Sequence, residues 1–196
     1  MKGLTISIIL GLLALLTGCQ SESTPPPQQS FDPAPWLEKG SRVQGASFAV
    51  LSTRLKSTMG QSGVSGAIRY CNVAAVPLLD TLSTKYDCTI RRATLQPRNP
   101  GNLANDHESA ILQNWAAELE QGIEPQAVVQ NLSADTIMYY APIRMQALCL
   151  NCHGKPGEGL ASETEQLIRD LYPNDQATGY AFGDLRGMWS IRFLNR

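Results

Sequence analysis

Two cysteines separated by two residues and followed at once by a histidine are the feature that most limits how this chain can be built: Cys149, Cys152 and His153. This C-x-x-C-H pattern is the attachment signature of a c-type haem. Each thiol adds to one vinyl group of a porphyrin, and the histidine presents an imidazole nitrogen to the iron. The motif therefore predicts one covalently bound haem c, and the rest of the chain is interpreted around it.

Other uses of a C-x-x-C pair fit less well. Such a pair also occurs in thioredoxin-like redox sites and as half of a zinc site. The sequence has no second C-x-x-C, and its only other histidine is His107. No βαβ pattern of the thioredoxin type surrounds the motif, so the haem interpretation is favoured over both.

The N-terminus has the pattern of an export signal. Lys2 supplies a positive charge and residues 4–16 form an apolar run, which is too short to span a membrane comfortably. The run ends in Leu-Thr-Gly-Cys, which resembles the lipobox of bacterial lipoproteins, where the signal is cut before the cysteine and the cysteine is acylated. Residues 1–18 are predicted to be a signal peptide and Cys19 a lipidation site. The alternative is an uncleaved membrane anchor.

Acyl chains on Cys19 predict binding to membrane lipid. Gln20, rather than aspartate, follows the cysteine, which favours the outer membrane of a Gram-negative bacterium and a periplasmic location. Covalent haem attachment in bacteria occurs outside the cytoplasm, so the two signals agree. Residues 19–36 are rich in serine, proline and glutamine and are predicted to form a disordered linker. Residues 37–196 are predicted to form one haem domain.

Periodicity and turn signals predict an α+β fold. Helices are expected over residues 37–58, 64–78, 105–122 and 162–171, and strands over 88–95, 135–145 and 188–194. Pro77 is expected to kink or end the second helix. Capping boxes are expected at Asn105 with Glu108 and at Ser162 with Glu165. The net charge of −1 gives no electrostatic case for nucleic acid.

Several segments resemble one known family. They are Ala67–Cys71, Ala93–Asn102, Tyr140–Ile143, Cys149–Gly154, Ala177–Tyr180 and Gly183–Gly187. The chain is similar to the DUF3365 or Tll0287-like single-haem proteins over about residues 40 to 194. The resemblance implies a PAS-like antiparallel sheet flanked by helices, with an N-terminal helical pair. It also implies a c-type haem whose axial ligands are the motif histidine and an upstream cysteine, here His153 and Cys71.

The residues alone leave the role of Cys71 open. With Cys19 acylated and two thiols bound to haem, Cys71 and Cys88 remain as an even pair in an oxidising compartment, so a disulfide is as reasonable as iron ligation. The resemblance favours Cys71 as the sixth ligand, and a thiolate there would lower the reduction potential. His107 lies in the first turn of a predicted helix beside two acidic residues, so we expect it to be solvated.

These observations predict a membrane-anchored, extracytoplasmic monohaem cytochrome that acts in electron transfer or redox sensing. Arg98 and Arg144 are candidate partners for the haem propionates. The alternative function is a sensor of nitric oxide or carbon monoxide. In either case we expect a separate redox or signalling protein as partner. A peroxidase would need an acid–base residue at a vacant distal site, which only His107 offers, so no enzymatic activity is expected.

Overall fold

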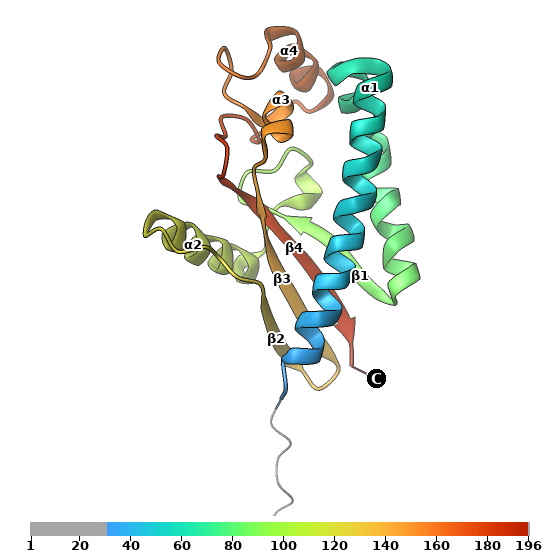
Figure 1. Ribbon diagram of the computed structural model, residues 1–196, viewed down its shortest axis with the longest axis vertical. Helices are drawn as coiled ribbons and strands as arrows, with labels where there is room; N and C mark the ends of the chain where they lie inside the picture. Colours follow the sequence, from blue (N-terminus) through green and yellow to red (C-terminus); the bar gives the residue numbers. More distant parts are fainter. Residues whose placement is uncertain (1–30, 196) are drawn as a thin grey trace, which may run out of the picture. The chain divides into compact units, whose positions relative to one another are not determined.

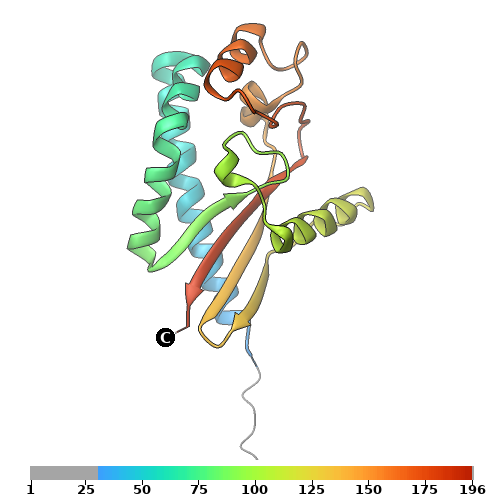
Figure 2. The same ribbon diagram turned by 180° about the vertical axis from the view of Figure 1, so that it is seen from behind.

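The computed structural model describes residues 31–195 and contains one four-stranded antiparallel sheet with helices on both faces (Figures 1 and 2). The strands lie in the order β1-β4-β3-β2. Their bounds are Cys88–Ala93 for β1, Val128–Ser133 for β2, Thr136–Arg144 for β3 and Leu185–Leu194 for β4. The predicted α+β class is confirmed. The predicted signal peptide (1–18) and Cys19 lie outside the described residues.

The first helix, α1 (Ala34–Tyr86), is a hairpin of two arms. The arms meet at Gly63, whose φ of 66° and ψ of −171° interrupt the helical backbone. Glycine reaches this region without the steric cost that a Cβ would bring. Figures 1 and 2 show the two arms side by side, the first rising from the N-terminal end and the second returning to β1.

Two expectations about α1 were wrong. The helix begins at Ala34, inside the predicted linker, and the Trp36 ring lies 5.7 Å from that of Phe193. Pro77 was expected to kink or end the second arm, but the arm continues through Pro77 to Tyr86, and the non-helical backbone of α1 lies at Gly63. Pro77 deprives the Val73 carbonyl of its amide partner, but Val73 is 72% exposed, so water can replace that partner.

Alternating side chains of the sheet form two cores. Ile137, Tyr139 and Ile191 face α1 in one hydrophobic cluster. Tyr140 and Met188 point to the opposite face and pack against α2 (Asp106–Glu120). The period of two along a strand separates the two sets.

The start of α2 has the predicted capping box. The Asn105 side chain accepts a hydrogen bond from the Glu108 amide, and the Glu108 carboxylate accepts one from the Asn105 amide. Glu108 also forms an ion pair of 3.1 Å with Arg91 on β1. The cap therefore fixes α2 against the sheet as well as starting the helix.

Four short elements gather beyond the end of the sheet where β3 stops and β4 begins (Figure 1). They are η1 (Pro100–Asn102), η2 (Ala147–Cys149), α3 (Leu150–His153) and α4 (Ser162–Leu171). The predicted helix α4 is confirmed, but its capping box is not. The N-cap residue is Ala161, whose methyl group cannot accept a hydrogen bond from the backbone. Within residues 31–195, no helix is both long and apolar enough to cross a membrane.

Candidate functional site

The C-x-x-C-H motif forms a tight turn directly after β3. Cys149 ends η2, and Cys152 and His153 lie in the single turn of α3. Both thiols are partly buried and neither is in a disulfide. Cys152 packs against a hydrophobic cluster that includes Ile68 of α1 and Leu160. The two thiols are thus held three residues apart at the junction of α1, α3 and the end of the sheet.

The imidazole of His153 is fixed by one backbone contact. Its Nδ1 lies 2.6 Å from the carbonyl oxygen of Ala177. A carbonyl only accepts hydrogen bonds, so Nδ1 carries the proton and Nε2 keeps its lone pair. The ring of Tyr180 packs edge-on against the imidazole, with centroids 6.4 Å apart. The histidine is therefore oriented with one nitrogen free to bind a metal.

The surroundings also keep His153 neutral. Burial lowers its pKa well below the usual 6.5, and the nearby cations of Arg98 and Arg186 lower it further. The hydrogen bond to Ala177 opposes this shift without overcoming it. At neutral pH the imidazole is unprotonated at Nε2, which is the form that ligates metals.

Backbone hydrogen bonds attach the Ala177–Tyr180 segment to the motif. The Tyr180 amide donates to the His153 carbonyl at 3.0 Å, and the Gly179 amide donates to the Gly154 carbonyl at 3.0 Å. A Cβ on Gly154 would lie 2.6 Å from the Leu150 carbonyl oxygen, so this position needs glycine. The histidine is held from both sides by a segment more than twenty residues further along the chain.

Arg98 joins a third segment to the same place. Its guanidinium donates to the Cys152 carbonyl at 2.7 Å and forms an ion pair of 3.0 Å with Asp175. A further hydrogen bond of 3.4 Å reaches the Ala177 carbonyl. Three of the segments singled out in the sequence thus meet at His153.

Cys71 lies on the second arm of α1 and faces this motif. It follows Ile68, which packs in the same cluster as Cys152, by about one helical turn. Burial raises the pKa of the Cys71 thiol, while Arg92 and Arg98 lower it. Charge on Cys71 in turn raises the pKa of Cys152, which burial brings to about 11. The thiol is close enough to the motif to share its electrostatic surroundings.

Cys88 lies elsewhere. Cys71 precedes Tyr86, at the end of α1, by fifteen positions, which is about 22 Å along the helix axis. A disulfide needs Cα atoms within about 7 Å, and both thiols are free. Burial raises the pKa of Cys88 to about 11, and its nearest charges are Lys39 and Asp87 rather than the arginines around Cys71. The structure therefore argues against pairing Cys71 with Cys88.

The two arginines suggested for the propionates are both engaged with protein groups. The hydrogen bonds of Arg98 hold the motif and Asp175 together. Arg144 donates from Nε to the Gly183 carbonyl at 2.6 Å and from Nη1 to Glu124 at 2.6 Å. Arg98 therefore lies at the motif as a structural clamp, and Arg144 bridges two loops.

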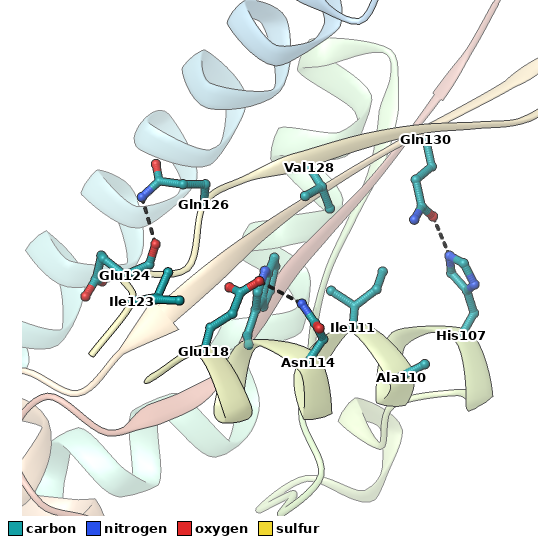
Figure 3. Close-up of a pocket in the computed structure, with 11 residues that line it drawn as sticks. His107, Ala110, Ile111, Asn114, Glu118, Ile123, Glu124, Gln126, Val128 and Gln130 are labelled. Carbon is teal, nitrogen blue, oxygen red and sulfur yellow. Dashed lines mark hydrogen bonds between the residues drawn. The ribbon is translucent and has the colours of Figure 1, made fainter. Parts of the chain in front are cut away.

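His107 is separated from Cys71 by the sheet. It lies on α2, whose face of the sheet is opposite to that of α1 (Figures 1 and 2). The imidazole is exposed and its Nε2 is 2.5 Å from Gln130 Oε1, at the rim of a pocket of about 480 Å³ between α2 and β2 (Figure 3). This histidine therefore cannot share an iron with Cys71.

Two further arginines at the site were missed in the sequence. Arg92 lies on β1 on the face of Ile90, and its Nε is buried without a hydrogen-bond partner. Arg186 donates from Nη1 to Thr94 Oγ1 at 2.8 Å and to the Gln96 carbonyl at 3.1 Å. Alternation from the apolar Ile90 could have placed Arg92 on the covered face of β1.

No cluster of three or more histidine, cysteine, aspartate or glutamate side chains able to hold an ion occurs in the part of the chain that the structure describes. The arrangement instead places one imidazole, that of His153, near the Cys71 thiol and beside the two free thiols of the motif. The fold and the site together define the class of this protein: an α+β domain with a C-x-x-C-H turn at the end of its sheet.

The chain belongs to the Tll0287-like family (Tll0287), whose model matches residues 23–193. Among solved structures, it is similar to the crystal structure of the cyanobacterial heme-protein Tll0287, with a TM-score of 0.58 and 21% sequence identity. That likeness covers 83% of this chain and 94% of the other, and it supports the fold. No curated protein matches.

Proposed function

We propose that this chain binds one haem c, through thioether bonds from Cys149 and Cys152, with His153 and Cys71 as the axial iron ligands. The observation that carries the proposal is the hydrogen bond from His153 Nδ1 to the Ala177 carbonyl, because it leaves Nε2 free on a neutral imidazole beside two unpaired thiols. The likeness to a protein described as a cyanobacterial haem protein supports the binding of a haem.

The residues present fit this group. A porphyrin supplies four nitrogens to its iron, so two protein ligands complete the coordination and no larger cluster is required. The thiols have the C-x-x-C spacing of the attachment site. The buried Nε of Arg92, which has no partner, also indicates that an acceptor belongs at this site.

We infer from this ligand set that the protein transfers single electrons or reports redox state. The haem supplies a one-electron centre. With protein side chains at both axial positions, no substrate has a vacant site, so this arrangement favours a carrier or sensor over an enzyme. We also propose that the sheet and its helices form a PAS-like domain. The chain is proposed to be exported and acylated at Cys19, and to act with a separate redox or signalling protein.

Attachment is tested on protein exported in a host that matures c-type cytochromes. We expect a pink protein that carries the mass of one haem and keeps its pigment in acidic acetone. Replacing both cysteines, Cys149→Ala with Cys152→Ala, should remove the covalent pigment, whereas Cys88→Ala should not. A colourless wild-type protein would contradict the proposal.

The sixth ligand is tested by comparing Cys71→Ser with Cys88→Ser. Both replace a partly buried thiol of α1 or β1 by a hydroxyl, but only Cys71 faces the motif. We expect Cys71→Ser to lose the thiolate-type optical spectrum and to have a higher midpoint potential, and Cys88→Ser to match the wild type. Carbon monoxide binding to the reduced wild type would instead support the gas-sensor alternative.

A further inference from the structure

Three arginines surround the imidazole of His153. Arg98, Arg186 and Arg92 each contribute a positive charge that lowers its pKa, and they come from different segments of the chain. Burial lowers the pKa of both Arg92 and Arg186, so neither guanidinium is freely hydrated. Buried cations require an anion or a full set of hydrogen-bond acceptors. Each of the three guanidinium groups therefore needs a negative charge or enough hydrogen-bond acceptors nearby.

Only one of the three charges is balanced by a carboxylate. Arg98 is paired with Asp175 at 3.0 Å, and the two side chains are 12% and 7% exposed. Within residues 31–195, no carboxylate lies within ion-pair distance of Arg92 or Arg186. Two partly buried cations at the site, Arg92 and Arg186, are thus without a carboxylate partner.

The hydrogen bonds of these two arginines are also incomplete. Arg92 Nε is fully buried and has no acceptor. Arg186 Nη1 donates to two neutral oxygens, those of Thr94 Oγ1 and the Gln96 carbonyl, while its guanidinium lies 5.4 Å from the centre of the Tyr180 ring. A planar guanidinium that lacks acceptors can bind a carboxylate, which accepts hydrogen bonds from two of its N–H groups at once.

We propose that Arg92 and Arg186 bind the two propionate carboxylates of the haem, and that Arg98 and Arg144 do not. The proposal rests on the proposed function, since it needs a haem at this site. A haem carries two carboxylates, and the site has two cations without one. Arg98 and Arg144 already have Asp175 and Glu124 as partners.

The experiment compares the holoprotein with Arg92→Gln and Arg186→Gln. Arg192→Gln is the matched control, because Arg192 is an exposed arginine in β4, near its C-terminal end and away from the motif. Midpoint potentials are measured between about pH 5 and pH 8, together with redox-difference infrared spectra in the carboxyl region. The covalent haem content of every variant is measured first.

Each Gln variant is expected to make one propionate easier to protonate, since its cationic partner is gone. The midpoint potential should fall at the alkaline end, because less positive charge then opposes oxidation of the iron. A tenfold change in the equilibrium constant for reduction corresponds to about 59 mV for one electron. Towards acid the potential should rise again, and a protonated-carboxyl infrared band should appear that is absent from wild type and Arg192→Gln.

A wild-type pH profile and wild-type carboxyl bands in both Gln variants would overturn the proposal. So would a shifted potential with unchanged carboxyl bands and an altered iron–thiolate absorption, which would assign Arg92 to Cys71 instead. If Arg92→Gln does not fold, Arg92→Lys keeps the charge and deletes the Nε donor. It should show a smaller shift in the same direction, and wild-type behaviour would count against the proposal. A colourless wild type contradicts the proposed function, whereas coloured, unchanged variants contradict only the propionate assignment.

Discussion

Replacing Arg98 with methionine should destabilise the domain far more than loss of the more exposed ion pair between Arg144 and Glu124. Arg98 connects three segments: its guanidinium contacts Asp175, the Cys152 carbonyl and the Ala177 carbonyl. Methionine fills similar space without donors. The substitution leaves a carboxylate that is 7% exposed without its cation and removes a donor from two carbonyls at the motif.

The magnitude follows from burial. Breaking a buried ion pair by removing one partner costs about 3–5 kcal/mol, because the remaining charge is uncompensated. An exposed pair contributes about 0–1 kcal/mol. Arg144→Met is the matched control, since Glu124 is 63% exposed. For a domain of this size, 1 kcal/mol corresponds to about 2–4 °C, so Arg98→Met should lower Tm by about 6–20 °C.

Urea unfolding of the two variants and the wild type, followed by circular dichroism, measures these differences. The double variant Arg98→Met with Asp175→Leu should be more stable than Arg98→Met alone, because it no longer buries an unpaired carboxylate. If Arg98→Met lost no more free energy of unfolding than Arg144→Met, the description of Arg98 as the clamp of the motif would be wrong.

Two further predictions concern packing and pH. Gly40→Ala should cost about 1–3 kcal/mol of unfolding free energy, because its Cβ would lie 2.1 Å from a ring carbon of Tyr139. Gly45→Ala on the same helix is the control and should not destabilise the domain, because its Cβ would meet nothing within 4 Å. Thermal melts of the two variants measure the difference. In a haem-free variant lacking both motif cysteines, the lowered pKa of His153 means that the unfolded state binds more protons below about pH 6.5. Stability should be complete above that pH and fall as the solution becomes more acidic. His153→Asn should flatten this dependence in urea titrations at a series of pH values, and an equally steep loss in that variant would refute the reasoning.

Local signals in the sequence predicted local structure well. The α2 cap was predictable because Asn105 and Glu108 satisfy each other's amides within one turn. Strand β2 was not predicted. It is an edge strand that pairs only with β3, and its burial does not alternate cleanly. Pro77 was expected to kink or end the helix, and the helix continues because the sequence does not show which face of a helix is solvated.

In the candidate site, too, contiguous features were visible in the sequence, whereas contacts between distant segments were not. The thiols and His153 could be named from their spacing because the motif is contiguous. The acceptor that fixes the histidine, the Ala177 carbonyl, is a backbone atom 24 residues away and has no sequence signature. Arg91 and Arg92 are adjacent in sequence but lie on opposite faces of β1. Arg91 pairs with Glu108, whereas Arg92 points toward Cys71. The alternation of side chains along β1 places Arg92 on the same face as the buried Ile90 and Arg91 on the other.

The turn at Gly63 has a consequence for how the domain is presented to other molecules. Helix α1 runs along the sheet and back; it begins at Ala34, and Trp36 in its first turn packs against Phe193, near the end of β4. The first arm has 29 residues from Ala34 to Ser62, or about 43 Å of helix. Both ends of the described chain therefore lie at the pole opposite the C-x-x-C-H turn (Figure 1). A molecule that binds at that pole would therefore leave the C-x-x-C-H turn, at the other end of the domain, uncovered.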